Sequence, residues 1–516
     1  MAVALSLSNL VYLRCWTELL SVSRNDFYWL QDIPPSPPHF VALMINIVVL
    51  ALVFAGLIAG LRSRHGVAFR LSPIFLLLVL LSLINSLRTL IGQPGNSLFL
   101  RFVEQRLPAI GVIVAIVVIV AIVTGGIRAL KPAYTLLMVL SPFVVLAFGQ
   151  AGYRIAAYDS PQEMDGPYAV RLPAKPAGSP RVVWVILDEW DDGLTFRERS
   201  PRIQLPEIDR LRSGSVFASQ AITANYNTDW SMPSLVTGMP VDSVHPDGPS
   251  EMMLRPPGSA QWLPWSAQPN VFRKARDLGF NTAVVAWAIP YCRVLKADLT
   301  DCSWWAGSNQ YNSSGTTVSK ILFNQQRSLF ESIYRSPFGQ SLSTIRHRTV
   351  YENVLAKSLQ VAPEGGFGLT LLHLPVPHPP YFYNAATGKN DFGATPFLGI
   401  LKQNQQGYID ALELTDKTIG AIRREMEKAG TWDTTTLIFS SDHPYRHHDT
   451  LDGKARSNTV PYLIKMAGQS SGLQYDTPFS ALLTGKLILA CLSGELSRPE
   501  QVAGWLDAHR SEYPIQ

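Results

Sequence analysis

The sequence has few cysteines and few charges, and these absences exclude several classes of protein. Its 516 residues include four cysteines, and no CxxC pair or Cys/His spacing indicates a structural zinc site. Charged residues make up 16% of the chain and the net charge is +5. No basic run carries interleaved aromatic side chains, so we exclude a nucleic-acid-binding protein.

Long apolar blocks dominate the chain before about residue 155, and a mixed globular composition follows. Since ~20 apolar residues cross ~30 Å of hydrocarbon, three blocks are long enough to span a membrane. A fourth block is slightly short. We predict a transmembrane bundle of four long helices within residues 1–151, formed by Phe40–Leu61, Leu71–Ile91, Pro108–Ile127 and Ala133–Ala151.

The opening segment, Met1–Leu20, is apolar but contains Asn9, Arg14 and Glu18. Two interpretations stay open, a short membrane span and an interfacial helix. A cleaved signal peptide is disfavoured, because the segment has no basic start and no clear small-residue cleavage site.

Basic loops predict the orientation of these spans. Arg62–Arg70 lies between the first two long blocks, and Arg128 and Lys131 lie in a later short loop. Both loops should be cytoplasmic. Arg101 and Arg106 are exceptions to this pattern, because they lie in a loop that should be on the opposite side of the membrane. We expect a multi-pass inner (plasma) membrane protein whose chain beyond residue 152 is extracytoplasmic, in the periplasm.

Cys292 and Cys302 lie ten residues apart in this exported part, where an oxidising compartment would favour a disulfide. Two unpaired thiols are the alternative. Cys15 and Cys491 are isolated.

Residues 152–180 are rich in Pro, Gly and Ala and are predicted to be a linker, and residues 181–516 form the exported domain. There, apolar β-branched runs alternate with helical patterns, which predicts an α/β domain with a mostly parallel sheet flanked by helices. The predicted strands are Arg181–Leu187, Val216–Thr223, Thr282–Trp287, Phe367–Leu374, Thr435–Phe439 and Tyr462–Lys465. The predicted helices are Pro206–Leu211, Val271–Leu278 and Gly407–Ala429.

Acidic residues and histidines follow several of these strands. Asp188 and Glu189 follow the first, and Asp442 and His443 follow a late one. Each group taken alone also fits an ordinary strand end or turn. Together they offer carboxylates and an imidazole at the sheet edge where ligands bind, which suits a divalent cation such as Zn²⁺, Mn²⁺ or Ca²⁺.

A hydroxyl-rich segment, Tyr226–Gly238, lies between these acidic groups in the sequence. A hydroxyl beside a divalent cation can act as a nucleophile in phosphoryl transfer. Thr228, Ser231 and Ser234 compete for this role. Alternatively, any of them caps a helix that Pro233 helps to start.

Further side chains are candidates for binding a substrate. His378 lies between prolines in an extended loop, whereas His373 lies within an apolar strand and is expected to be structural. His447 and His448 suit a second metal or substrate oxygens, and Arg446 and Arg456 suit a phosphate. Taken singly, each arginine also fits an ordinary surface residue.

At these motifs the chain resembles the alkaline phosphatase/sulfatase superfamily, in particular the membrane-anchored phosphoethanolamine transferases and lipoteichoic acid synthases. Sulfatases carry C-x-P-S-R-x-x-L-x-T-G. Aligned on Leu235–Gly238, the chain has Ser231 at the serine position and Thr228 at the cysteine position, which favours Thr228. The resemblance implies metal binding by Asp188, Glu189 or both, together with Thr228, Asp442 and His443. It also implies substrate contacts or a second metal at His378 and a later histidine.

The chain also departs from the sulfatase pattern. Threonine cannot become formylglycine, Trp230 and Met232 replace the Pro and Arg of the motif, and Pro444 follows Ser-Asp-His. We therefore expect a metal-dependent phosphoester transferase or hydrolase that forms a phospho-threonine and acts on a lipid-linked or cell-envelope substrate beside membrane lipids. The alternatives are a periplasmic phosphatase or phosphodiesterase that uses water, and a catalytically silent envelope-assembly protein.

Overall fold

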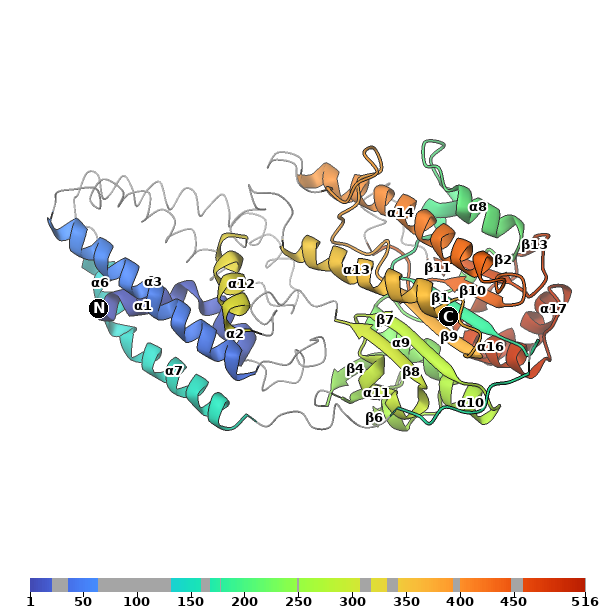
Figure 1. The fold of residues 1–516 in the computed structure, drawn as a ribbon, viewed down its shortest axis with the longest axis horizontal. Helices are drawn as coiled ribbons and strands as arrows, with labels where there is room; N and C mark the ends of the chain where they lie inside the picture. The colour runs from blue at the N-terminus through green and yellow to red at the C-terminus, as the bar shows by residue number, and fades with distance from the viewer. Residues whose placement is uncertain are drawn as a thin grey trace. The chain divides into compact units, whose positions relative to one another are not determined.

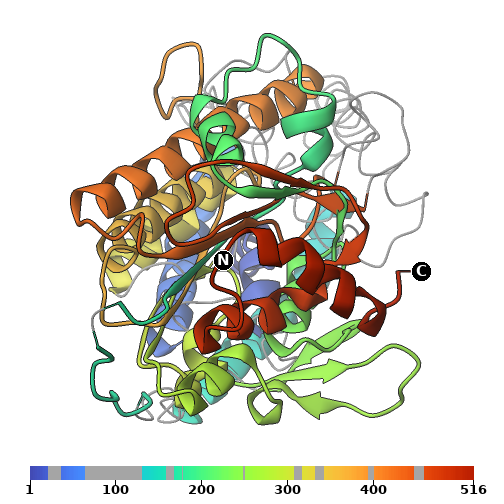
Figure 2. The ribbon, with the colours of Figure 1, turned by 90° about the vertical axis from the view of Figure 1, so that its right-hand side faces the viewer.

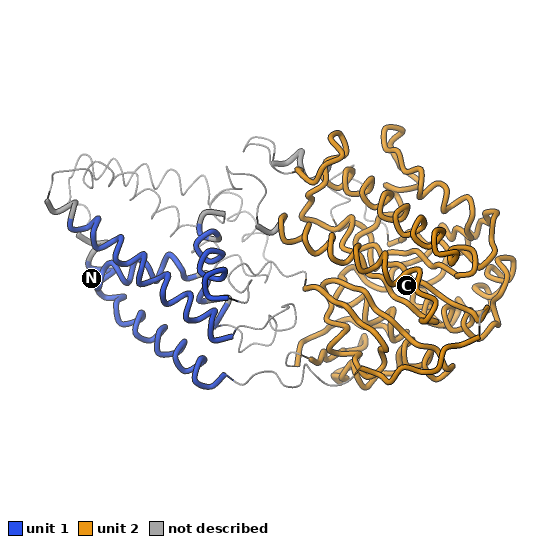
Figure 3. Tube along the Cα trace, in the orientation of Figure 1, with its two compact units in different colours: residues 1–27, 33–160, 310–342 blue, residues 28–32, 161–309, 343–516 orange. Residues whose placement is uncertain are grey.

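The computed structural model describes residues 1–20, 36–63, 131–158, 168–176, 178–247, 250–306, 317–331, 342–392, 400–446 and 458–515. The chain forms two compact units, shown in blue and orange in Figure 3. Unit 1 comprises residues 1–27, 33–160 and 310–342, and unit 2 comprises residues 28–32, 161–309 and 343–516. Residues 310–342 therefore belong to the unit that the N-terminal third forms, although they interrupt the sequence of unit 2.

Unit 1 is built from helices. They are α1 (Ala2–Val11), α2 (Leu13–Leu20), α3 (Pro37–Ser63), α6 (Lys131–Val139), α7 (Ser141–Ala156) and α12 (Val318–Glu331). Two segments, Pro37–Ala59 and Thr135–Ala156, are long and apolar enough to cross a membrane. The predicted spans Leu71–Ile91 and Pro108–Ile127 lie outside the described residues, so the four-helix bundle stays a prediction.

Two of the predicted apolar segments are divided. Met1–Leu20 forms two short helices, because α1 ends at Val11 and α2 begins at Leu13. The segment predicted as Ala133–Ala151 begins in α6 and continues through α7, whose Ser-Pro start places the proline in the first turn, where a helix tolerates it.

Helix α12 packs against α3 through buried amides. Gln325 Nε2 donates to the carbonyl of His39 at 3.1 Å, and Gln325 Oε1 accepts from Asn46 Nδ2 at 2.9 Å. Asn46 Oδ1 accepts in turn from Gln326 Nε2 at 2.8 Å. Since Asn46 and Gln325 are both buried, satisfying their amides in this one arrangement fixes how the two helices align.

An eight-stranded sheet forms the centre of unit 2 (Figure 1). Its order is β13-β2-β12-β10-β1-β9-β7-β8, and β12 is antiparallel to both of its neighbours while the other pairs are parallel. The strands are β1 (Val182–Leu187), β2 (Val216–Ala218), β7 (Thr282–Trp287), β8 (Asp301–Trp305), β9 (Leu369–Leu374), β10 (Thr436–Ser440), β12 (Tyr462–Lys465) and β13 (Leu473–Tyr475). The central strands are buried on both faces, which explains their continuous apolar sequences. The predicted α/β fold with a mostly parallel sheet is confirmed.

One strand prediction is wrong in its extent. Val216–Thr223 is two strands in different sheets, β2 and β3 (Ala221–Ile222), because the chain turns at Ser219 and Gln220. Strand β3 lies between β11 (Thr459–Val460) and β14 (Phe479–Ser480) in a second sheet. A third sheet contains β4 (Ser243–Pro246), β5 (Met252–Arg255) and β6 (Leu263–Pro264).

Helices cover both faces of the large sheet (Figures 1 and 2). Side chains of β1 alternate between two cores, with Trp184 in one and Val185 in the other. The first core includes α9 (Thr228–Thr237), α10 (Val271–Asp277), α11 (Tyr291–Val294), α16 (Thr484–Ser493) and α17 (Glu500–His509). The second includes α8 (Pro206–Ser213), α13 (Leu342–Val361) and α14 (Ile400–Lys428). The three predicted helices correspond to α8, α10 and most of α14.

Cys292 of α11 and Cys302 of β8 form a disulfide, as predicted. The bond ties a short helix to the last strand of the large sheet. Cys15 and Cys491 are free and buried.

Reducing this disulfide should lower the stability of the protein. A loop with a sequence separation of 10 is expected to contribute about 3 kcal/mol through the entropy of the unfolded chain. Dithiothreitol should therefore lower the midpoint of thermal unfolding of the wild type. The double variant Cys292→Ser/Cys302→Ser should start at the lower midpoint and not respond to the reductant. A wild-type midpoint that the reductant leaves unchanged would contradict this account.

Candidate active site

Strands β1 and β10 end side by side. They pair in parallel with Ile186 opposite Ser440, so Asp188 and Asp442, each two residues further on, leave the same edge of the sheet. Strand β9 lies on the other side of β1, with His373 opposite Ile186. The carboxyl ends of three neighbouring parallel strands thus meet at the edge where such sheets bind ligands.

Hydrogen bonds join the two acidic loops directly. Ser441 Oγ accepts from the amide of Trp190 at 2.9 Å and lies 2.8 Å from the carbonyl oxygen of Leu187. Asp442 Oδ1 accepts from the amides of Glu189, at 3.2 Å, and His443, at 2.9 Å. Hydrogen bonds from the side chains of Ser441 and Asp442 to backbone groups of the first loop therefore hold the two loops together.

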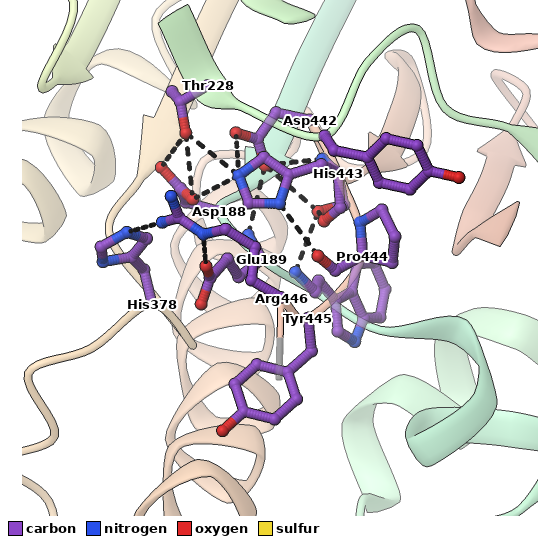
Figure 4. A network of polar contacts seen from close by, with 12 residues as sticks. Asp188, Glu189, Thr228, His378, Asp442, His443, Pro444, Tyr445 and Arg446 are labelled. Carbon is purple, nitrogen blue, oxygen red and sulfur yellow. Dashed lines mark hydrogen bonds and ion pairs between the residues drawn. The ribbon is translucent and has the colours of Figure 1, made fainter. Parts of the chain in front are cut away.

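Thr228 begins α9 and faces the acids (Figure 4). Its Oγ1 lies 3.3 Å from Asp188 Oδ2 and 3.3 Å from His443 Nε2. The loop before the helix is held by Thr223, whose hydroxyl lies 2.8 Å from the carbonyl of Asp442. The structure thus brings the hydroxyl, an early acid and the late Asp-His pair together.

The two serines of the same segment lie elsewhere. Ser234 Oγ donates to the carbonyl of Trp230 at 2.7 Å and accepts from the amide of Val241 at 3.0 Å. Ser231 is fully buried, and its hydroxyl has no hydrogen-bond partner among the described residues. Pro233 lies inside α9 and does not start it, so the helix-start alternative is wrong on this point.

The ring of His443 is oriented by Pro444. Its Nδ1 lies 2.9 Å from the carbonyl oxygen of Pro444, which can only accept, so Nδ1 carries a proton and Nε2 is the nitrogen whose lone pair can bind a cation. Nε2 lies 3.4 Å from Asp442 Oδ2 and 3.8 Å from Asp188 Oδ1. The acceptor is a backbone carbonyl, so it orients the ring whatever side chain stands at position 444.

Asp188, Asp442 and His443 form a donor group that fits a divalent cation. One ligand atom from each lies within 4.8 Å of the others, and all three side chains are buried. Asp442 Oδ2 is buried without a hydrogen-bond partner in the described part of the chain. Two carboxylates and an imidazole lone pair directed at one space repel one another unless a positive charge lies between them.

Glu189 does not join this group but binds Arg446. Its Oε1 contacts Arg446 Nε, and Arg446 Nη2 lies 2.6 Å from His378 Nε2 (Figure 4). The backbone of Glu189 is left-handed, with φ of 62°, and its carbonyl accepts from Tyr408 Oη at 2.8 Å. Arg446 and His378 therefore lie beside the donor group. His447, His448 and Arg456 are outside the described residues.

Burial shifts the titration of two side chains at the site. Burial raises the pKa of Asp188 well above its ordinary value, and the nearby carboxylates Asp442 and Glu189 raise it further. Burial also lowers the pKa of His378 to about 4, so its ring is neutral at pH 7. A neutral His378 Nε2 accepts a hydrogen bond from Arg446, whose charge is paired with Glu189.

Sequence reasoning did not find several residues that support this site. Trp287 lies edge-on to the His378 ring, with centroids 5.0 Å apart, and His347 Nε2 lies 3.0 Å from the carbonyl of His378. His373 is buried in its strand, as expected, but its Nε2 lies 3.5 Å from Asp188 Oδ2. Trp287 ends a predicted strand, so its position was a usable signal. His347 lies in α13, which was not predicted.

Comparison with known proteins identifies the family. Residues 180–484, more than half of the chain, match the family described as Sulfatase. The chain belongs to the sulfatase family. This places it in the alkaline phosphatase/sulfatase superfamily, as the resemblance implied, and supports a hydrolase or transferase of phosphoesters or sulfate esters.

Individual relatives match the chain over a short segment or at low sequence identity. The chain is 33% identical over 126 residues to the multifunctional alkaline phosphatase superfamily protein PehA of Trinickia caryophylli. That match covers 23% of this chain and 24% of PehA. The phosphonate monoester hydrolase of Agrobacterium radiobacter is 15% identical, with a TM-score of 0.40, over 61% of this chain and 74% of that one. The corresponding enzyme of Silicibacter pomeroyi is 13% identical, with a TM-score of 0.43, over 61% and 73%.

Removing the charge of Asp188 should stabilise the metal-free protein at pH 7. A buried carboxyl with a raised pKa contributes its full stability below the ordinary value and loses it as the pH rises through the raised value. Each pKa unit between the folded and the unfolded state lowers the free energy of unfolding by about 1.4 kcal/mol at a pH above both values. Asp188→Asn should therefore raise the midpoint of thermal unfolding, by about 2 °C or more, in chelator at pH 7.

This gain should shrink as the pH is lowered toward the ordinary pKa of an aspartate, because Asp188 then binds a proton in the unfolded chain as well as in the folded one. Asp298→Asn is the matched control, since Asp298 is buried but bonded to Arg273 at 2.9 Å, and its loss should destabilise the protein. A lower midpoint of thermal unfolding for Asp188→Asn than for the wild type at pH 7 would refute the claim that the Asp188 carboxyl destabilises the metal-free protein.

Proposed function

We propose that this chain is a metal-dependent phosphoester transferase or hydrolase that forms a covalent phospho-threonine at Thr228. The observation that carries the proposal is the position of Thr228 Oγ1, 3.3 Å from both Asp188 Oδ2 and His443 Nε2. A nucleophile needs a nearby activating group, and here the hydroxyl borders the donor group that suits a divalent cation. Phosphoester chemistry is favoured over sulfate-ester chemistry because threonine cannot be converted to formylglycine.

Asp188, Asp442 and His443 would hold the cation, with Thr228 as a further oxygen ligand. Zn²⁺, Mn²⁺ and Ca²⁺ all suit these donors. When bound, the cation would make the Thr228 hydroxyl more acidic and offset the negative charge that develops on the phosphoryl oxygens.

The side chains around Thr228 suit the two chemical steps. Thr228 Oγ attacks phosphorus, the bond to the leaving oxygen breaks, and the leaving group departs with the electron pair. The hydroxyl proton has an acceptor in Asp188 Oδ2, 3.3 Å away. Arg446, which lies beside His378, would bind a phosphoryl oxygen, and the amino end of α9 favours an anion. An acceptor hydroxyl or water then attacks the phosphorus, the bond between phosphorus and Thr228 Oγ1 breaks, Asp188 returns the proton to Thr228, and the proton of the attacking oxygen passes to solvent.

The proposed setting is the outer face of the inner membrane. Two helices with the length and composition of membrane spans support an anchor, and a disulfide in unit 2 is typical of an oxidising compartment such as the periplasm. A multi-pass anchor would keep the catalytic unit near lipid-linked or other envelope phosphoesters. The substrate class proposed is therefore a phosphoester of the membrane surface.

Replacing Thr228 tests the nucleophile. Thr228→Ala should reduce turnover by at least about 10³-fold, as expected for a covalent nucleophile, and should leave the midpoint of thermal unfolding close to that of the wild type. Thr228→Ser keeps a hydroxyl and should retain partial activity. Ser231→Ala in the same helix is the control and should remain active. Equal turnover by Thr228→Ala and the wild type would exclude the mechanism.

A labelled substrate separates transfer from hydrolysis. Purified full-length protein is incubated with phospholipid carrying a labelled phosphoryl headgroup, and products are separated by chromatography. Label on a hydroxyl acceptor identifies a transferase, and label in a water-soluble phosphate product identifies a hydrolase. In both cases quenching in acid should trap label on wild-type protein but not on Thr228→Ala. Turnover without trapped label would count against the covalent intermediate.

A further inference from the structure

His373 is a polar residue in the interior of a central strand. It lies opposite Ile186 of β1, and neither His373 nor Tyr291 of α11 is exposed to solvent. Burying an imidazole costs free energy unless its nitrogens have polar partners. The partners of the two ring nitrogens therefore indicate what this residue does.

The first partner is Tyr291. Its Oη lies 3.1 Å from His373 Nδ1 and has no other hydrogen-bond partner within the described ranges. The phenol O–H has no other acceptor in the described part of the chain, so it donates to Nδ1. An imidazole that accepts a hydrogen bond at Nδ1 carries its proton on Nε2.

The second partner is a carboxylate of the donor group. His373 Nε2 lies 3.5 Å from Asp188 Oδ2 and makes no hydrogen bond with the described residues. The same carboxylate oxygen faces Thr228 Oγ1 at 3.3 Å. The Nε2 that carries the proton thus lies beside the carboxylate that the nucleophile also contacts.

Rigid neighbours hold this arrangement in place. Tyr291 is followed by Cys292, whose disulfide ties α11 to β8. Trp265 packs edge-on against Tyr291 with centroids 5.9 Å apart, and Trp287 packs edge-on against His373 at 6.3 Å. A histidine that only fills space needs no carboxylate at its second nitrogen, and this one has both a fixed tautomer and an acidic neighbour.

We infer that Tyr291 and His373 are positioning residues, which orient the Asp188 carboxylate for the cation and for Thr228. The inference rests on the proposed function, because it takes Asp188 as a metal ligand. Removing an outer-shell partner of a metal-ligating side chain typically changes metal affinity by about 10- to 100-fold.

Two amide substitutions at His373 differ in reach and form a matched pair. The nitrogen of Gln in His373→Gln can take the place of Nε2 and donate to Asp188, whereas the shorter amide of His373→Asn reaches only toward Tyr291. Full-length protein is purified in detergent, freed of metal with chelator, and titrated with Mn²⁺ by calorimetry. We expect His373→Asn to bind Mn²⁺ about 10-fold or more weakly than wild type and His373→Gln to bind it nearly as tightly.

Tyr291→Phe should weaken Mn²⁺ binding by a smaller factor, because the imidazole then places its proton on either nitrogen. Wild-type affinity in His373→Asn, or an equal loss in the Asn and Gln variants, would overturn the inference.

A second measurement keeps the test independent of the proposed function. The midpoints of thermal unfolding of wild type, Asp188→Asn, His373→Asn and the double variant are compared in chelator. Non-additive shifts are expected, since the two side chains contact each other. Additive shifts would overturn the positioning contact even if metal binds. A wild type that binds no Mn²⁺ but shows non-additive shifts would instead refute the metal-dependent function and retain the contact.

Discussion

The candidate site depends on the parallel pairing of β1 with β10. Because Ile186 lies opposite Ser440, the acids that follow the two strands emerge together, although 254 positions separate Asp188 from Asp442 in the sequence. A shift of one residue in this register would turn the side chains of one strand to the other face. Both strands are buried and apolar along their length, so the hydrophobic cores on the two faces of the sheet keep the register and thereby keep the acids together.

That geometry has a cost in the metal-free protein. Asp188, Asp442 and the His443 lone pair converge in a buried space, and Glu189 next to them adopts a left-handed backbone that a β-carbon disfavours. Arg446 balances part of the negative charge through Glu189. Buried like charges and a strained residue at a strand end are features that proteins retain where a ligand compensates for them, and they occur here together beside a helix-terminal hydroxyl.

Much of this arrangement could be predicted from the sequence because parallel central strands have a strong signature. The runs at β1, β7 and β10 are apolar and rich in β-branched residues, the run at β9 is rich in leucine, and each predicted strand agrees with the observed one to within two residues. The residues that follow β1 and β10 could then be predicted as site residues, because such sheets bind ligands at the carboxyl ends of their strands. The choice of Thr228 among three hydroxyls needed the sulfatase motif, since the local pattern alone fits all three.

Other features have no local signal. The position of residues 310–342 in unit 1 depends on contacts such as Asn46 with Gln325, which are 279 residues apart. Likewise, the sequence pattern predicts that His373 is a core residue, and only the pairing of β9 with β1 brings it next to Asp188. The contact between Tyr291 and His373 also arises only in the folded chain. Side chains that support a site through tertiary contacts can be found only once the sheet order is known.

The most direct test of the central claim is the location of a bound ion. Crystals of the full-length protein soaked in Mn²⁺ would be measured for anomalous scattering. The account predicts an anomalous peak among Asp188, Asp442, His443 and Thr228 Oγ1, at about 2.0–2.3 Å from their ligand atoms. Ordered density for these four side chains without an anomalous peak between them, at a saturating Mn²⁺ concentration, would contradict it.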